Sequence, residues 1–114
     1  MPAGKKNLII EQGTDFSFSV TLKDPVTGLV INLTGYTFAA QIREEYSSAA
    51  VLQAFTIDNS VPTTGVITLS ISNANTSLLE AQKTFYYDIE GVNTSSKKFR
   101  ILEGSVYVSP EVTR

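Results

Sequence analysis

Apolar and polar side chains alternate along this chain, most regularly in residues 15–22 and 83–92. In the first stretch Phe16, Phe18 and Val20 occupy every second position, with serine between them. Successive side chains of a strand point to opposite faces, whereas a helix would distribute these residues around its axis. Both stretches are therefore predicted to be strands with one face in a hydrophobic core and the other in water.

The second of these stretches is followed by a polar connector, residues 93–98, and by another apolar run in residues 99–109. Within the stretch, Phe85, Tyr87 and Ile89 fall on one face. The connector is short and rich in residues that bond their own backbone, which favours a tight reversal of the chain. We predict an antiparallel hairpin whose apolar face is covered by the strands that precede it.

Turn-forming residues separate further short apolar runs at spacings near ten residues, the pattern of an antiparallel sandwich of two sheets and about eight strands. Helical signals occur near residues 75–81, where Asn75 or Thr76 could cap a single turn. The predicted strands cover residues 7–11, 15–22, 29–32, 36–43, 51–57, 66–72, 83–92 and 99–109.

The composition fits one globular domain. A chain of 114 residues with 42% hydrophobic residues can bury a core without disulfides and lies far from the disordered range. We expect a flexible amino-terminal arm at residues 1–6, a single β-sandwich domain at residues 7–109 and a carboxy-terminal tail at residues 110–114.

Net charge and the length of the apolar runs argue against two classes of partner, nucleic acids and membranes. A net charge of −2 provides no basic surface for DNA or RNA, so we expect no nucleic-acid partner. No run approaches the twenty or so apolar residues of a membrane span, and the first residues lack the apolar segment of a signal peptide. We therefore expect no membrane partner and a protein that stays, or is assembled, in the cytoplasm.

The chain offers little for catalysis. It has no cysteine and no histidine, which removes thiolate nucleophiles, the usual general base and the commonest metal ligand. Asp88 and Glu90 share a strand face, with Glu103 across the hairpin, and could bind calcium or act as an acid and a base. A solvated charged surface is the alternative, and ordinary surface composition favours it. We predict no enzyme, no cofactor and no metal site.

The tyrosines have two interpretations. Exposed Tyr46, Tyr86 and Tyr107 would be anchors at a protein interface, where tyrosine is enriched. Tyr86 or Tyr87 would instead form a tyrosine corner, its hydroxyl bonding the backbone near residues 78–79. We favour the corner for one of these two residues.

Four segments of the chain, taken together, carry a resemblance to a known family. They are residues 12–16, 32–43, 85–89 and 102–114. In this order they resemble the small immunoglobulin-like structural proteins of tailed bacteriophages. More loosely, the Gly-x-Asp opening within the first segment and the Leu-Thr-Gly step within the second are similar to the amino-terminal domain of upper-baseplate proteins that hold receptor-binding proteins. The resemblance implies an immunoglobulin-like sandwich and supplies no catalytic residue.

The resemblance also implies a virion component, assembled in the host cytoplasm, that binds other virion proteins in multiple copies. Open sheet edges accept partner strands, and the arm and tail are free to reach neighbours. The candidate interface residues are Lys5, Lys6, Tyr46, Tyr107, Glu111, Val112 and Arg114.

Several positions and roles fit this picture. The baseplate similarity favours the tail, baseplate or neck, and decoration of the capsid is the alternative. A carbohydrate-binding or adhesive module for host-surface glycans is a further alternative, since immunoglobulin-like sandwiches also serve such roles. The chain has no tryptophan for the stacking platform that sugar sites usually expose. An enzyme is the weakest interpretation.

Overall fold

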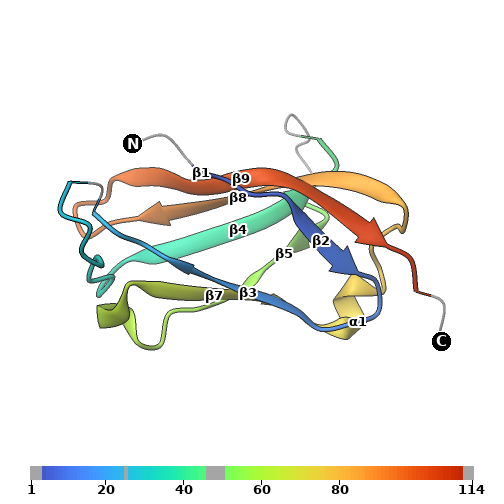
Figure 1. Cartoon of the computed structure of the whole chain (residues 1–114), viewed down its shortest axis with the longest axis horizontal. Helices are drawn as coiled ribbons and strands as arrows, with labels where there is room; N and C mark the ends of the chain where they lie inside the picture. Colours follow the sequence, from blue (N-terminus) through green and yellow to red (C-terminus); the bar gives the residue numbers. More distant parts are fainter. Residues whose placement is uncertain (1–3, 25, 46–50, 112–114) are drawn as a thin grey trace.

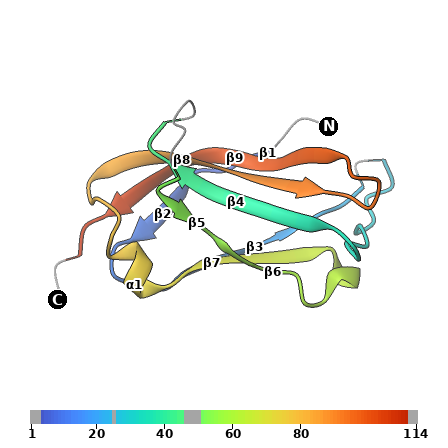
Figure 2. The same ribbon diagram turned by 180° about the vertical axis from the view of Figure 1, so that it is seen from behind.

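The computed structural model describes residues 4–24, 26–45 and 51–111, and it shows two β-sheets packed face to face (Figures 1 and 2). The larger sheet has six strands and the smaller has three, which confirms the predicted all-β sandwich. The strands of the larger sheet are β1 (Gly4–Lys5), β2 (Leu8–Glu11), β4 (Thr37–Arg43), β5 (Gln53–Ala54), β8 (Lys83–Val92) and β9 (Lys98–Ser109). Those of the smaller sheet are β3 (Phe16–Thr21), β6 (Thr56–Asp58) and β7 (Val66–Ile71).

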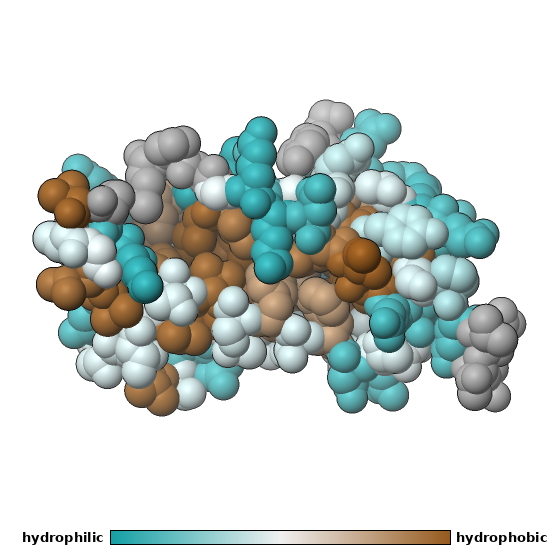
Figure 3. Space-filling model, viewed as in Figure 1, coloured by the Kyte–Doolittle hydropathy of each residue, from teal (hydrophilic) through white to brown (hydrophobic). Residues whose placement is uncertain are grey.

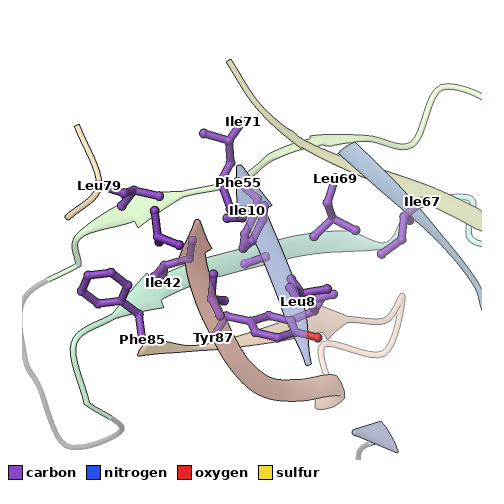
Figure 4. Close-up of a cluster of buried hydrophobic side chains, with 14 of the residues drawn as sticks. Leu8, Ile10, Ile42, Phe55, Ile67, Leu69, Ile71, Leu79, Phe85 and Tyr87 are labelled. Carbon is purple, nitrogen blue, oxygen red and sulfur yellow. The ribbon is translucent and has the colours of Figure 1, made fainter. Parts of the chain in front are cut away.

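The antiparallel hairpin that the alternation predicted is formed by β8 and β9, and it lies at the centre of the larger sheet. The two strands pair antiparallel along their whole length, with a bulge between Ile89 and Glu90. Phe85, Tyr87 and Ile89 all point into the core, and each side chain is at most 3% exposed. Figure 4 shows the core between the two sheets, with Phe85 and Tyr87 from the larger sheet and Ile67, Leu69 and Ile71 from the smaller one.

Two strand pairs are parallel rather than antiparallel. β1 and β2 both run alongside β9 in the same direction, with Leu8 opposite Val106. Almost the whole chain separates β2 from β9, so no hairpin imposes the antiparallel direction. Within the arm expected at residues 1–6, Gly4–Lys5 forms β1, because the edge of β9 offers backbone partners. The next residue continues this pairing, and the Lys6 N–H donates to the Glu103 carbonyl at 3.0 Å.

The strand predicted at residues 29–32 is wrong. The structure has only an isolated bridge there, between Lys23 and Val30, because a tight turn closes the loop before a ladder can form. The run at residues 51–57 contains two strands, since the chain leaves the larger sheet after β5 and enters the smaller one as β6. Phe55, between them, is 6% exposed and fills the space where the chain crosses.

The helical turn lies slightly earlier than predicted. A single turn, α1 (Asn73–Thr76), follows β7, and a 3-10 turn, η1 (Pro62–Thr64), precedes that strand. Within the described residues no helix is long and apolar enough to cross a membrane. The described loop residues 22–24 and 26–36 lie with η1 at one end of the sandwich, and α1 lies at the other (Figure 1).

Candidate protein-interaction site

One long side of the sandwich is only partly closed. β3 is an edge strand of the smaller sheet, and in the described residues it pairs with β7 alone. Its inward-facing residues Phe16, Phe18 and Val20 remain half-exposed, whereas the inward-facing residues of β7 are at most 2% exposed. Figure 3 shows apolar side chains gathered on this side, between β9 and β3 of Figure 1. The difference in exposure follows from the missing neighbour of β3.

A groove of about 440 Å³ occupies the uncovered half of this side. The other half is closed by β2, whose inward-facing Leu8 and Ile10 are 5% and 0% exposed. β1 continues the path of β2 but is short and brings no apolar side chain to the groove. Half-exposed aliphatic and aromatic residues of both sheets therefore face solvent here. The groove is lined by Gly4, Val20, Thr21, Leu22, Lys23, Ile31, Phe99, Arg100, Ile101 and Leu102.

The predicted interface lysines lie beside this groove. Lys5 is opposite Glu103 of β9, and both Lys5 and Lys6 are exposed. The Tyr87 hydroxyl donates a 2.7 Å hydrogen bond to the Lys6 carbonyl oxygen. Gly104 lies under the same carbonyl, and a side chain there would collide with the Lys6 backbone. The backbone of Lys6 is therefore fixed from two directions, while its side chain is free to contact a partner.

Tyr107 lies on the outer face of the larger sheet. Its β2 neighbour in the register is Ile9, and the two side chains are 41% and 65% exposed. Thr84 of β8 is its neighbour on the other side. Together these residues make a small amphipathic surface at the end of β9 nearest to α1, a position suited to an interface anchor.

Glu111 lies at the same end, against the turn at residues 12–15. Gly13 adopts a left-handed φ of 84°, and the Glu111 carboxylate packs over it. The Gln12 side chain donates to the Leu79 carbonyl at 2.9 Å and accepts from the Glu111 N–H at 3.2 Å. One glutamine thus ties together the first turn, the segment after α1 and the residues after β9.

Thr76 attaches α1 to the same turn. It is a buried polar residue, and its hydroxyl accepts from the Gly13 N–H at 3.1 Å and donates to the Thr14 carbonyl at 2.7 Å. The Asp15 carboxylate in addition accepts from the Asn73 N–H at 2.7 Å. The Gly-x-Asp opening is therefore a structural joint, with each of its three residues bonded to α1.

The acidic residues on the hairpin form ion pairs with basic side chains of β9. Arg100 lies 3.5 Å from the Asp88 carboxylate and 3.3 Å from that of Glu103, and Lys98 lies 3.5 Å from Glu90. Burial raises the pKa of Asp88 above its usual value, and the Glu90 carboxylate raises it further. Among the residues that the structure describes, no three potential metal ligands come together. The geometry fits the charged-surface interpretation.

Comparison with known proteins identifies the family. The model of the LtfC-like β-sandwich domain matches residues 2–109, which is nearly the whole chain. This chain belongs to the LtfC-like family. A search of curated proteins found no match.

Solved structures with the same sandwich support the LtfC-like chain's fold alone. One is a chain of the crystal structure of ICOS in complex with ICOS-L and an anti ICOS-L VNAR domain, with a TM-score of 0.55 and 12% identity. The match covers 94% of this chain and 56% of that chain, so the LtfC-like domain spans just over half of its length. At this identity the likeness confirms the immunoglobulin-like architecture and carries no function.

At Tyr87 the hydroxyl donates to a different backbone carbonyl from the one expected of a tyrosine corner. The hydroxyl of Tyr87 bonds a backbone carbonyl, but that carbonyl belongs to Lys6 rather than to residues 78–79. The two groups meet because Tyr87 lies opposite Gly104 of β9, which has no side chain, and the Lys6 carbonyl lies against Gly104. Tyr86 is half-buried on the opposite face of the strand.

Among the predicted interface residues of this LtfC-like domain that the structure describes, Lys5 and Lys6 lie apart from Tyr107 and Glu111. Lys5 lies opposite Glu103 of β9, and Tyr107 follows four residues later on the same strand, about 13 Å away along it. Tyr46, Val112 and Arg114 fall outside the described residues. Sequence reasoning missed the groove, because which sheet edge stays open depends on strand partners far apart in the chain. The only signal for it was the small and cationic character of residues 4–6.

Proposed function

We propose that this LtfC-like domain is a non-enzymatic structural protein of a bacteriophage particle, part of the tail, baseplate or neck, that docks on other virion proteins. The family match over residues 2–109 carries this proposal, because it supports a tail-associated structural protein. The sequence resemblance to phage immunoglobulin-like proteins supports the same role. The free edge of β3 and the apolar groove supply a surface for protein contacts.

The docking surface proposed here combines two regions. The first is the groove side with Lys5 and Lys6, and the second is the outer face around Tyr107 with Glu111 at the end of the described chain. Both are at the edge of the larger sheet formed by β1, β2 and β9, so one neighbouring protein can contact both. Tyr46, Val112 and Arg114 complete the proposed set.

Electron microscopy of labelled particles tests the proposal. Gold-labelled protein on the tail, baseplate or neck is the expected result, and label on the head would favour the capsid-decoration alternative. The Tyr107→Ala variant is expected to lower the labelling, because it removes an exposed aromatic anchor. Leu78→Ala, which shortens an 80% exposed side chain beside α1, is the matched control. Unlabelled particles would contradict the virion role.

A further inference from the structure

We propose that the uncovered half of the groove binds an extended apolar segment of another virion protein, which adds to β3 as an antiparallel strand and places an acidic residue beside Lys23. This inference rests on the proposed function and specifies its partner. Three observations carry it: the free backbone groups of β3, the apolar walls of the groove and the charge at its end.

The register shows which backbone groups of β3 are free. Directly after β3, the Leu22 N–H donates to the Gly65 carbonyl at 2.7 Å. The backbone N–H of Leu22 therefore points toward the β7 side of β3. In an antiparallel pair, residues that bond one neighbour alternate with residues whose N–H and C=O point away from it. Counting back from Leu22 gives the residues that present backbone groups to the open side. They are Ser17, Ser19 and Thr21.

The walls of the groove require an apolar occupant. Val20 projects inward from β3 and stays half-exposed, as do Ile101 and Leu102 of β9. Where β2 crosses the neighbouring half, the inward-facing residues of β9, Val106 and Val108, are 0% exposed. An extended segment paired with β3 and facing β9 would bury the open half in the same way, with apolar side chains at alternate positions.

The charge at the groove end selects an acidic partner. Lys23 and Arg100 are the charged lining residues, and no carboxylate lines the described groove. Arg100 already pairs with Asp88 and Glu103. Within the described residues Lys23 forms no ion pair, and the adjacent Asp24 carboxylate is bonded to the turn backbone. An antiparallel strand begins beside Lys23, so the acidic residue is the first of the bound segment.

Particles assembled with two lysine variants test the binding site. Val20→Lys points a charge into the groove from β3, and natural edge strands use inward-pointing charges to block pairing. Ile57→Lys is the matched control, because Ile57 is also a half-buried, inward-facing residue, but lies on β6 at the other edge of the same sheet. Thermal melts first establish that both variants fold.

The expected result is a loss of about tenfold in particle occupancy for Val20→Lys and a change below about twofold for Ile57→Lys. Absence of the wild-type protein from particles would overturn the proposed function together with this inference. Wild-type protein on particles with Val20→Lys at equal occupancy would overturn the inference alone.

Peptide titrations test the chemistry of the occupant without relying on folding of a groove variant. The probe is a peptide of alternating valine and threonine that begins with aspartate, and the control peptide begins with lysine. In NMR spectra of the wild-type protein, the amide signals of Ser17, Ser19 and Thr21 should shift, with affinity about fivefold higher for the aspartate peptide. Lys23→Glu should reverse this preference, and Lys97→Glu, outside the groove, should leave it unchanged. Equal affinity for both peptides, or no shift along β3, would overturn the inference.

Other occupants would give distinct results. A wild-type dimer in sedimentation that Val20→Lys dissociates would assign the groove to a second copy and overturn the proposal. A shift of the β3 amide signals on deletion of residues 1–3, without peptide, would assign it to the chain itself and also overturn the proposal.

Discussion

Replacing Thr76 with valine measures how strongly α1 is held to the turn at residues 12–15. The side chain is fully buried, and its hydroxyl makes two hydrogen bonds to that turn, with Gly13 and Thr14. Valine has the same branching and nearly the same size, so the substitution removes the bonds without opening a cavity. A typical intramolecular hydrogen bond contributes about 1 kcal/mol net, so the expected loss in the free energy of unfolding is about 2 kcal/mol.

Calorimetry gives the corresponding shift in Tm. For a chain of 114 residues the entropy of unfolding is about 0.24 kcal/mol/K, so the loss lowers Tm by about 8 °C. Ser77→Ala is the control, because its exposed hydroxyl bonds the Asn73 carbonyl one turn earlier, and its Tm should change by about 2 °C or less. A Thr76→Val protein that melts within about 2 °C of the wild type would refute the role of the hydroxyl.

Two further substitutions test the larger sheet. Gly104→Ala brings a methyl group against the Lys6 carbonyl and should lower the free energy of unfolding in urea by about 1–3 kcal/mol. The control, Ser105→Ala, should have little effect. Equal stability of the two variants would show that β1 moves aside freely. The pKa of Asp88 is higher in the folded state than in the unfolded state, so ionising this carboxyl lowers the stability of the fold as pH rises above the unfolded-state pKa. Asp88→Asn removes this ionisation, so it should raise Tm at pH 7 and leave Tm unchanged near pH 3. A lower Tm for this variant at pH 7 would mean that its ion pair across the hairpin outweighs the burial of the carboxylate.

The parts of the fold that sequence predicted correctly are those set by local alternation. Phe16 and Phe18, or Phe85 and Ile89, fix one face of a strand without reference to any distant residue. The prediction at residues 29–32 failed because an apolar run this short forms a strand only when a partner lies alongside it. The division of residues 51–57 between two sheets also depends on partners, here β4 and β7.

The candidate site was less accessible from sequence for the same reason. Exposure of Val20 or Leu102 results from the absence of a neighbouring strand, and nothing in their own segments encodes it. A hydroxyl bonded to backbone was expected for Tyr86 or Tyr87, and the Tyr87 hydroxyl does bond a backbone carbonyl, because a buried phenol requires a partner. Its partner lies 81 positions away, at Lys6, and only the folded chain brings the two together.

The parallel pairing of β2 with β9 has a mechanical consequence. β1 begins in the left half of Figure 1 and β9 ends toward its right, so tension applied at the start of β1 and at the end of β9 acts along the strands. The hydrogen bonds between these strands are then loaded in shear and share the force, instead of opening one after another like a zipper. Rupture requires them to break together, which gives the sandwich high resistance to stretching from its ends.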